Sequence, residues 1–566
     1  VKVSVSTEGP VVVASVNTVD ISFDRPGDRI VNFVLKTTGK EGTARVRIKA
    51  EGGGYTASET ISVPVRNPNP YISERYAAVL EPGGSRTIEY GSFSDEDASA
   101  VLELASFPSM DIRGCLDFVT GYRYECTEQI SARGIVLLSL KKFLKEDETV
   151  ADSLVTSLLG RLYGRQLADG GFPLWPGQTA ANEWVTSMAG QFMAMAAAGG
   201  YEVNKGVFDA WANFQKRCSK NYMPPAGALT QAYRLYSLAL ASVPENGEMN
   251  RLKEAGAIPD IAKWMLASAY AINGKKAVAK EIITGLKTDT EDTGYADGFG
   301  STMRDRAIML ESLVLADDIY GALDIAEEIS RACGNGSWYT TQQTAFVSSA
   351  MGRLADMVNT GALHAEMRYT GAASARSGPA KINSTGAVYS VPLSINGKGI
   401  EIKNLSEGPV YATVITRHRP SADAAVSGSS SGIGLAVTYT DLDGSVISSK
   451  SIRQGSDFKA EVTVTNNTGT TDLTSLALSI PVPSGWEIFN DRLFGGSAAG
   501  NGYDYVDIRD DRAIYYFDLP KGTEKTFSIR LRAAYKGEFV LPAISCEAMY
   551  SPGVNARTAS GTTAVD

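Results

Sequence analysis

The sequence is short of histidine, and the two histidines that it has are isolated. His364 and His418 are the only ones among 566 residues, and neither has a cysteine or carboxylate cluster beside it. Zinc sites in proteins draw on close-spaced Cys and His ligands. We therefore expect no zinc site and no other cofactor, and we interpret both imidazoles as surface or locally hydrogen-bonded groups.

Cysteine is also sparse. The five cysteines, at positions 115, 126, 218, 333 and 546, form neither a close-spaced metal set nor an even disulfide framework. Without Cys126 the remaining four are scattered along the chain. Free structural thiols fit this spacing at least as well as disulfide bridges do.

Long apolar runs and dense basic runs are both absent. No stretch is apolar over the length that a bilayer requires, and the chain begins at Val1 without a signal-like leader, which indicates a fragment or a processed form. A net charge of −9 argues against a nucleic-acid partner. A composition of 43% apolar and 21% charged residues is typical of globular proteins, and the length predicts several domains.

Hydrophobic patterning divides the first two thirds of the chain into a β-like and a helical part. Residues 1–107 contain alternating segments such as Ala44–Ala50, separated by Gly, Pro and Asn clusters, which is typical of an antiparallel sandwich. In residues 108–362, apolar side chains such as Trp184 and Met188 recur at helical spacing. Roughly ten to twelve helices fit this interval, and they must pair to bury their apolar faces, as in an α/α toroid.

Strand-like patterns return after the helical part. Residues 363–426 are rich in small side chains, and Ser427–Gly432 has the composition of a linker. Residues 427–566 alternate again and contain turn signals. The charged cluster Asp510–Arg512 in this last part is interpreted as a structural turn network.

The residues that carry chemistry stand at the start of the helical part. Cys126 and Gln129 are three residues apart where turn residues give way to a helical pattern, so the thiol and the carboxamide can meet across one turn. Free amides at a helix N-terminus favour a thiolate. Such a thiolate can attack the Gln129 carbonyl and expel ammonia, which leaves an internal thioester. A lone cysteine at a helix start is equally compatible with a small buried hydrophobe.

The sequence around this pair resembles a known reactive motif. Tyr122-Arg-Tyr-Glu-Cys-Thr-Glu-Gln-Ile-Ser131 is similar to the thioester signature of the α2-macroglobulin and complement family, which in bacterial members commonly reads Tyr-Pro-Tyr-Gly-Cys-x-Glu-Gln. Arg123 replaces the usual Pro and Glu125 the usual Gly. The reacting pair, Cys126 and Gln129, is intact. The two replacements change residues that make this loop rigid and shielded in the family.

Other stretches extend the resemblance over essentially the whole chain. Gln166–Trp175 and Tyr339–Phe346 look like recurring stretches of the thioester-containing helical domain of the family. Ile508–Phe517 and Glu547–Pro552 resemble its C-terminal macroglobulin-like sandwich. The chain is therefore similar to the C-terminal portion of a bacterial α2-macroglobulin.

The resemblance implies a multidomain protein with an inserted helical domain. Residues 1–107 and 363–426 are expected to form the two parts of one CUB-type β-sandwich, interrupted by an α/α-toroid thioester domain at 108–362. Residues 427–566 are expected to form the macroglobulin-like sandwich. The earlier macroglobulin domains and the protease-cleaved bait segment of the family are missing from this sequence.

The resemblance also implies a broad-spectrum proteinase inhibitor that acts as a single-use covalent trap and not as an enzyme. After bait cleavage, a proteinase lysine displaces Cys126 from the Gln129 acyl group. The expected location is the periplasm or cell envelope of a bacterium, with a membrane tether in the full-length protein.

Glu128 is expected to orient the loop or accept a proton, or else to lie on a solvated face. Tyr122 and Tyr124 are candidates to cover the sulfur, or ordinary core residues.

Two other functions stay open. A thioester can serve covalent adhesion to host surfaces, and an upstream anchoring stalk in place of a bait segment would indicate that use. A toroid enzyme such as a terpenoid cyclase needs an acidic motif, and its nearest candidate, Asp289–Asp292, has the sequence of a solvated loop.

In either thioester function we expect reaction with amines and not with sugar hydroxyls. Some complement-type relatives reach hydroxyls through a helical-domain histidine, and here no histidine lies between Cys126 and residue 362.

Overall fold

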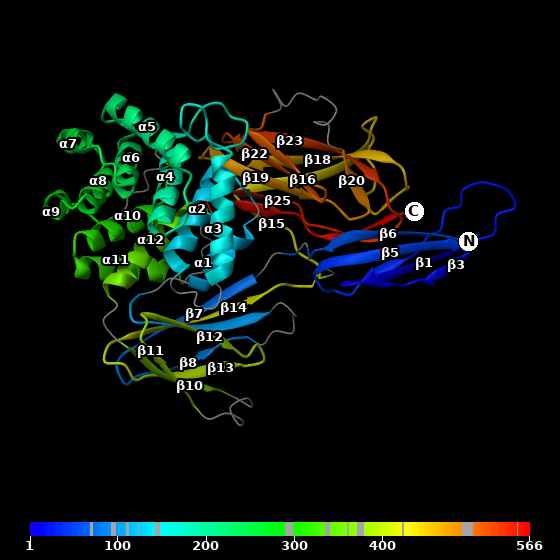
Figure 1. Ribbon diagram of the computed structural model, residues 1–566, viewed down its shortest axis with the longest axis horizontal. Coiled ribbons are helices and arrows are strands. Elements are labelled where there is room, and N and C mark those ends of the chain that lie inside the picture. Colours follow the sequence, from blue (N-terminus) through cyan, green and yellow to red (C-terminus); the bar gives the residue numbers. More distant parts are fainter. Residues whose placement is uncertain are drawn as a thin grey trace.

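A computed structural model shows an N-terminal sheet, a β-sandwich, a helical part and a terminal β-sandwich (Figure 1). It describes residues 1–566 apart from positions 68, 70–71, 92–97, 109–111, 123, 142–147, 289–297, 334–339, 359–361, 371–378, 422–423, 490–501 and 552, and apart from the side chains of 113, 117, 148–150 and 333. Arg123 and the acidic segment Asp289–Asp292 therefore lie outside the described residues.

The N-terminal part is a sheet with the strand order β3-β1-β5-β6 and a separate β2-β4 pair. These strands are β1 (Lys2–Glu8), β2 (Val11–Val13), β3 (Thr18–Asp20), β4 (Leu35–Thr37), β5 (Gly42–Gly52) and β6 (Tyr55–Val65). β5 and β6 form a long hairpin whose turn residues, Gly53 and Gly54, have φ angles of 58° and 82°. Only glycine adopts such angles readily, which explains the Gly-rich turn in the sequence.

The second part is a sandwich built from both sides of the helical insertion. One sheet has the order β11-β10-β13-β8 and the other β12-β9-β14-β7. The strands before the insertion are β7 (Ile72–Leu80), β8 (Ser85–Glu89) and β9 (Ser99–Ala105). Those after it are β10 (Leu363–Tyr369), β11 (Ala380–Ser384), β12 (Val388–Leu393), β13 (Gly399–Asn404) and β14 (Val410–His418).

This pairing corrects the expectation that residues 1–107 form one β piece completed by residues 363–426. In the described part of the chain, β1 to β6 pair among themselves, and it is β7 to β9 that pair with the strands after the helices. Alternation reveals that a segment is a strand, but it carries no information on which distant strand completes its sheet. The completed sandwich has its own core, in which Leu102, Ile402 and Val414 are fully buried.

The helical part joins the end of β9 to the start of β10. Its helices are α1 (Ile112–Gly121), α2 (Thr127–Leu140), α3 (Glu148–Tyr163), α4 (Glu183–Ala198), α5 (Lys205–Asn221), α6 (Ala228–Leu240), α7 (Asn246–Glu254), α8 (Asp260–Ile272), α9 (Lys276–Ile283), α10 (Thr302–Leu315), α11 (Ile319–Cys333) and α12 (Thr341–Met357). Each even-numbered helix from α2 to α12 packs against the next even-numbered one, and α12 packs against α2. The even-numbered helices therefore form a closed ring, with odd-numbered helices packed on its outside (Figure 1).

The terminal part is a second sandwich. A six-stranded sheet of order β15-β26-β25-β19-β22-β21 faces a four-stranded sheet of order β16-β18-β23-β20, and β17-β27-β24 form a third sheet. The strands are β15 (Ser429–Ser431), β16 (Ile433–Asp441), β17 (Ser451–Ile452), β18 (Asp457–Asn466), β19 (Leu473–Pro481), β20 (Trp486–Ile488), β21 (Tyr505–Ile508), β22 (Arg512–Leu519), β23 (Glu524–Ala533), β24 (Gly537–Leu541), β25 (Ser545–Ala548), β26 (Asn555–Arg557) and β27 (Gly561–Val565). The linker expected at Ser427–Gly432 instead contains β15, which pairs with β26.

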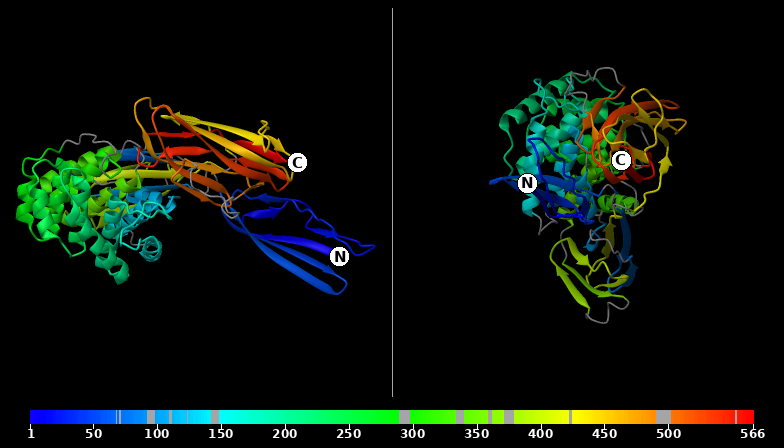
Figure 2. Two further views of the ribbon diagram at one scale, coloured as in Figure 1. Left: turned by 90° about the horizontal axis from the view of Figure 1, so that it is seen from above. Right: turned by 90° about the vertical axis from the view of Figure 1, so that its right-hand side faces the viewer.

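The terminal sandwich packs against the helical ring near the start of α2. Two further views show these two parts beside each other (Figure 2). Ala477, Ile514 and Tyr516, from β19 and β22, join Cys126 and Trp175 in one buried cluster between the two parts. None of the described helices is both long and apolar enough to cross a bilayer.

Glycine at two positions lets neighbouring helices approach closely. A Cβ atom on Gly190 of α4 would lie 1.8 Å from the Trp211 ring, and one on Gly134 of α2 would lie 2.1 Å from the Phe192 ring. Aromatic side chains occupy the space that any other residue would need. The sequence shows these glycines only as interruptions of a helical pattern.

We predict that Gly190→Ala lowers the stability of the helical part by about 1–3 kcal/mol, because an added methyl group overfills a packed core. The thermal midpoint measured by far-UV circular dichroism reports the change. Gly160→Ala in α3 is the matched control, since apart from the adjacent backbone of its own helix no atom lies within 4 Å of its Cβ position, and it should leave the midpoint unchanged or raise it. Equal midpoints for wild type and Gly190→Ala would contradict the close approach of α4 to Trp211.

Candidate functional site

Cys126 and Gln129 form a reciprocal cap at the start of α2. Cys126 is the N-cap residue, and its sulfur accepts a hydrogen bond from the Gln129 backbone N–H at 3.5 Å. The Gln129 side-chain Oε1 accepts one from the Cys126 backbone N–H at 2.7 Å. This capping box satisfies two backbone donors that the helix leaves without partners. Each side chain thus bonds the backbone N–H of the other residue across one turn. That the thiol and the carboxamide react with each other stays a prediction.

The whole Cys-Thr-Glu-Gln segment is shielded from water. Cys126, Thr127, Glu128 and Gln129 each have 0% exposed surface. The alternative that Glu128 lies on a solvated face is therefore wrong. A polar helix start at this depth needs internal hydrogen-bond partners, because unpaired polar groups are costly to bury.

Glu128 receives these partners from two distant segments. Thr341 at the start of α12 donates its hydroxyl to Oε2 at 2.8 Å and approaches Oε1 at 3.1 Å. The Tyr550 hydroxyl donates to Oε2 at 3.0 Å. Burial raises the pKa of Glu128 to about 7, although the hydrogen bonds from Thr341 and Tyr550 oppose the shift. The carboxyl is thus poised to gain or lose a proton near neutral pH.

The environment of the Cys126 thiol differs from the expectation of a favoured thiolate. Its sulfur lies 3.9 Å from the Tyr550 hydroxyl and 4.0 Å from Glu128 Oε2. Burial, followed by the Glu128 charge, raises the pKa of the thiol well above its usual range. The Gln129 amide and Arg165 act in the opposite direction but do not outweigh burial. The expectation of a favoured thiolate was wrong because the start of α2 is shielded from water.

Met549 and Tyr550 close the site from the terminal sandwich. Met549 Sδ lies 3.3 Å from Gln129 Nε2, and Tyr550 faces the Cys126 sulfur. Both follow β25 directly, so one turn covers both halves of the pair. Sequence reasoning noted Glu547–Pro552 only as a family likeness. It did not identify these contacts because about 420 residues separate the two segments.

Tyr122 and Tyr124 lie beside the pair in a chain of edge-to-face rings. Their ring centroids are 5.3 Å apart, and Tyr124 meets Tyr516 at 5.7 Å. Burial raises the pKa of both phenols well above the usual range, and Tyr124 is hydrogen-bonded to Glu547. Among the described residues, the phenol recorded in contact with the sulfur is that of Tyr550. That Tyr122 and Tyr124 support a thioester stays a prediction.

Glu125, which replaces the glycine of the family signature, anchors the approach to α2. It is paired with Arg161 and lies 3.3 Å from Arg133 Nη1. A further hydrogen bond holds this loop, because the Thr127 backbone N–H donates to the Leu174 carbonyl at 2.9 Å. These contacts restrain the segment around Cys126 without a proline or glycine.

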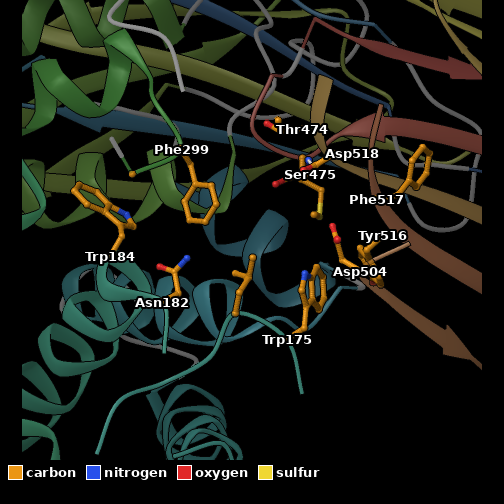
Figure 3. Close-up of a pocket in the computed structure, with 13 residues that line it drawn as sticks. Trp175, Asn182, Trp184, Phe299, Thr474, Ser475, Asp504, Tyr516, Phe517 and Asp518 are labelled. Carbon is orange, nitrogen blue, oxygen red and sulfur yellow. Dashed lines mark hydrogen bonds between the residues drawn. The ribbon is translucent and has the colours of Figure 1, made fainter. Parts of the chain in front are cut away.

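A cavity of about 350 Å³ lies next to this site, between the helical ring and the terminal sandwich (Figure 3). Its lining comes from both parts and consists of Leu174, Trp175, Asn182, Trp184, Gly298, Phe299, Thr474, Ser475, Asp504, Tyr516, Phe517, Asp518 and Met549. Met549 therefore contacts the Gln129 carboxamide and also lines the cavity.

Comparison with known sequences points to one family. Residues 432–553 match the bacterial alpha-2-macroglobulin MG10 domain. An alpha-2-macroglobulin of Xylella fastidiosa is 25% identical over 608 aligned positions, which cover 98% of this chain and 36% of that protein. An alpha-2-macroglobulin homolog of Yersinia pestis is 20% identical, with 95% and 29% covered. The chain thus spans about a third of the length of these relatives.

Solved structures share the fold. Native alpha-2-macroglobulin of Escherichia coli, spanning the residues from domain MG7 to the C-terminus, has a TM-score of 0.83 at 19% identity, with 100% of this chain and 94% of that chain covered. Salmonella alpha-2-macroglobulin reacted with methylamine also has a TM-score of 0.83, at 20% identity, with 100% and 38% covered. Along its whole length, the chain is similar in sequence and fold to the C-terminal portion of the bacterial alpha-2-macroglobulins.

Proposed function

We propose that this chain is the reactive C-terminal portion of a covalent proteinase trap, in which Cys126 and Gln129 form an internal thioester. The observation that carries the proposal is the reciprocal capping box at a fully buried helix start. It holds a thiol beside a carboxamide where water, the competing nucleophile, is excluded. A cysteine that served only as a packed hydrophobe would need neither the Gln129 side chain nor the Tyr550 hydroxyl beside it.

Formation of the thioester is an exchange within the capping box. The Cys126 sulfur adds to the Gln129 side-chain carbonyl carbon, the C–N bond breaks, and the thiol proton leaves with the nitrogen as ammonia. Because the thiol pKa is raised by burial, the proton must be removed as sulfur attacks. Glu128, whose Oε2 lies 4.0 Å from the sulfur, is the acceptor in reach.

In the transfer step, sulfur is the leaving group and an amine is the nucleophile. The lone pair of a lysine amine attacks the Gln129 carbonyl carbon, the C–S bond breaks, and Glu128 accepts the proton from nitrogen and passes it to sulfur. The products are an isopeptide and a free Cys126 thiol. Since the acyl group is used once, the chain is a single-use reagent and not an enzyme.

The architecture supports this assignment. The closed ring of even-numbered helices has the form of an α/α toroid, and the sandwich completed by β7 to β9 is assigned as the CUB-type domain. Met549 and Tyr550 reach the thioester pair from the terminal sandwich, so a shift of that sandwich away from α2 uncovers the site. In the full-length protein we assign the trigger of this shift to proteinase cleavage of a bait segment.

The relatives carry the name alpha-2-macroglobulin, and this supports the assignment of proteinases as the partners. We further propose a periplasmic or cell-envelope location and a membrane tether in the full-length protein. Both rest on the family resemblance. The proteinase is attached through its lysine amines.

The intact mass of the freshly purified protein tests the proposal. We expect a mass lower by one ammonia than the sequence requires, and methylamine should add to it while one thiol becomes free. Cys126→Ala should have the full sequence mass and should not take up methylamine. Identical behaviour of wild type and Cys126→Ala would rule out a thioester in this protein.

Removal of the Tyr550 ring is expected to speed the reaction of the thioester with methylamine. Tyr550→Ala takes away the group that covers the sulfur and donates to Glu128, and the rate constant should rise by at least about tenfold. Thiol titration over time measures this rate. Tyr535→Ala is the matched control, since Tyr535 is 58% exposed and lies elsewhere on the terminal sandwich. If both variants react like wild type, Tyr550 does not shield the bond.

Glu128→Gln, measured on the fraction of the variant that carries the thioester, tests Glu128 as the proton acceptor of the transfer step. A carboxyl with a pKa of about 7 is protonated below that pH and can accept a proton only above it. The ratio of wild-type to Glu128→Gln methylamine rates should therefore rise as pH increases through 7 and then level off, at up to about a hundredfold. Ionisation of methylamine cancels in the ratio. A ratio that does not vary with pH would exclude Glu128 as the acceptor.

A further inference from the structure

Arg165 is a partly buried cation beside the candidate site, and one end of its guanidinium has no partner. It follows α3 and begins the stretch that leads to Trp175. Its Nη1 atom is shielded from water and, among the described residues, has no hydrogen-bond acceptor. The neighbouring cations Arg133 and Arg161 are both paired with Glu125. A shielded donor without an acceptor costs free energy, so Arg165 is the group here that packing alone does not explain.

The chain ties Arg165 to both sides of Cys126. Arg161, one helical turn before Arg165, is paired with the carboxylate of Glu125, which directly precedes Cys126. The residue that follows Cys126 donates its backbone N–H to the Leu174 carbonyl at 2.9 Å. Helix α3 itself packs against α2 (Figure 1). The segment from Arg161 to Leu174 is thus fastened at both ends next to the sulfur-bearing residue, and Arg165 lies between the two attachments.

The charge of Arg165 acts on the Cys126 sulfur. Burial and then the Glu128 charge raise the pKa of the thiol, whereas Arg165 lowers it. The other titratable groups that act electrostatically with this sulfur are three phenols, Tyr122, Tyr516 and Tyr550. Burial raises the pKa of all three well above the usual range, so they stay uncharged near neutral pH. Among the described residues, Arg165 is therefore the cation recorded as acting on the sulfur.

This arrangement does not depend on the docked terminal sandwich. Arg165 and Cys126 both belong to the helical part, whereas Met549 and Tyr550 belong to the sandwich that moves away in the proposed trap. Movement of the sandwich removes the burial that keeps the sulfur neutral. The guanidinium stays beside the sulfur, and entering water weakens its attraction for a negative charge without abolishing it.

We propose that Arg165 stabilises the negative charge that develops on the Cys126 sulfur when the thioester opens. The inference rests on the proposed function and deepens it by assigning a residue to the leaving group. As the amine adds to the Gln129 carbonyl carbon, the C–S bond breaks and its electron pair passes to sulfur. The guanidinium keeps its own protons and attracts this charge until Glu128 delivers a proton to sulfur.

Arg165→Gln tests this role through the direction of the rate change. On the fraction of the variant that carries the thioester, methylamine uptake should be about tenfold slower than in wild type, because the leaving thiolate has lost its countercharge. Arg165→Lys keeps the charge and should react within about threefold of wild type. Lys205→Gln removes a cation whose side chain is 85% exposed, and as the control for net charge it should leave the rate unchanged.

The rates are compared at methylamine concentrations where uptake is proportional to concentration, so that the chemical step and not the opening of the site is measured. A variant whose site was merely loosened would react faster than wild type. A faster or unchanged rate in Arg165→Gln, or a rate in Arg165→Lys as slow as in Arg165→Gln, would overturn the proposal.

A second measurement does not need a thioester. In Gln129→Ala no internal acyl group can form, and Cys126 stays a free thiol. Alkylation by neutral iodoacetamide at pH 8, located by peptide mass spectrometry, reports the thiolate fraction, because burial raises the pKa of this thiol. Gln129→Ala/Arg165→Gln should react about tenfold more slowly at Cys126. The rate at Cys218, a partly buried thiol on α5, is the internal control and should not change.

The two measurements separate the role of Arg165 from the thioester itself. Slower alkylation of Cys126 in a protein whose wild type shows no loss of ammonia would retain the action of Arg165 on the sulfur and reject the thioester. Equal alkylation with and without Arg165 would reject its role, whatever the mass of the wild type.

Discussion

The contact between the start of α2 and the turn after β25 is the interaction on which the rest of the structure depends. Tyr550 bonds Glu128 and faces the Cys126 sulfur, and Met549 touches Gln129. The four residues Cys126–Gln129 are fully buried where the helical ring and the β-sandwich meet. Burial of the site and the docking of two domains are therefore one event.

Burial also decides the chemical state of the site. It holds the Cys126 thiol in its protonated form and places the pKa of Glu128 near neutrality. Such an environment preserves a reactive bond, because water is excluded. The helix start supplies amide donors, but their effect on the thiol is smaller than the cost of removing a charge from water. In the proposed trap this site stores the thioester, and exposure of the bond to an amine requires movement of the terminal sandwich.

The surrounding architecture connects the proposed movement to the rest of the chain. The helical ring is inserted between β9 and β10, so it is tied to its own sandwich by two chain crossings. The terminal sandwich instead meets the ring through side chains such as Trp175 and Tyr516, whose centroids are 4.0 Å apart. It is also linked to the N-terminal sheet by the Arg66–Asp511 ion pair, which agrees with a structural role for Asp510–Arg512. A domain held by side-chain contacts separates more easily than one held by shared strands.

The sequence alone determined the local features. Alternating and helical periods located the β, helical and β parts, and the spacing of Cys126 and Gln129 placed both on one helix turn, because these features depend on near neighbours. Tertiary structure decided what depends on distant segments. It joined β7 to β9, and not the whole of residues 1–107, with the strands after the helices. It brought Thr341, Met549 and Tyr550 to the Cys-Thr-Glu-Gln segment, and it reversed the expected pKa shift of the thiol. Burial is a property of the packed molecule, and the hydrophobic period of a segment does not identify the surface against which it packs.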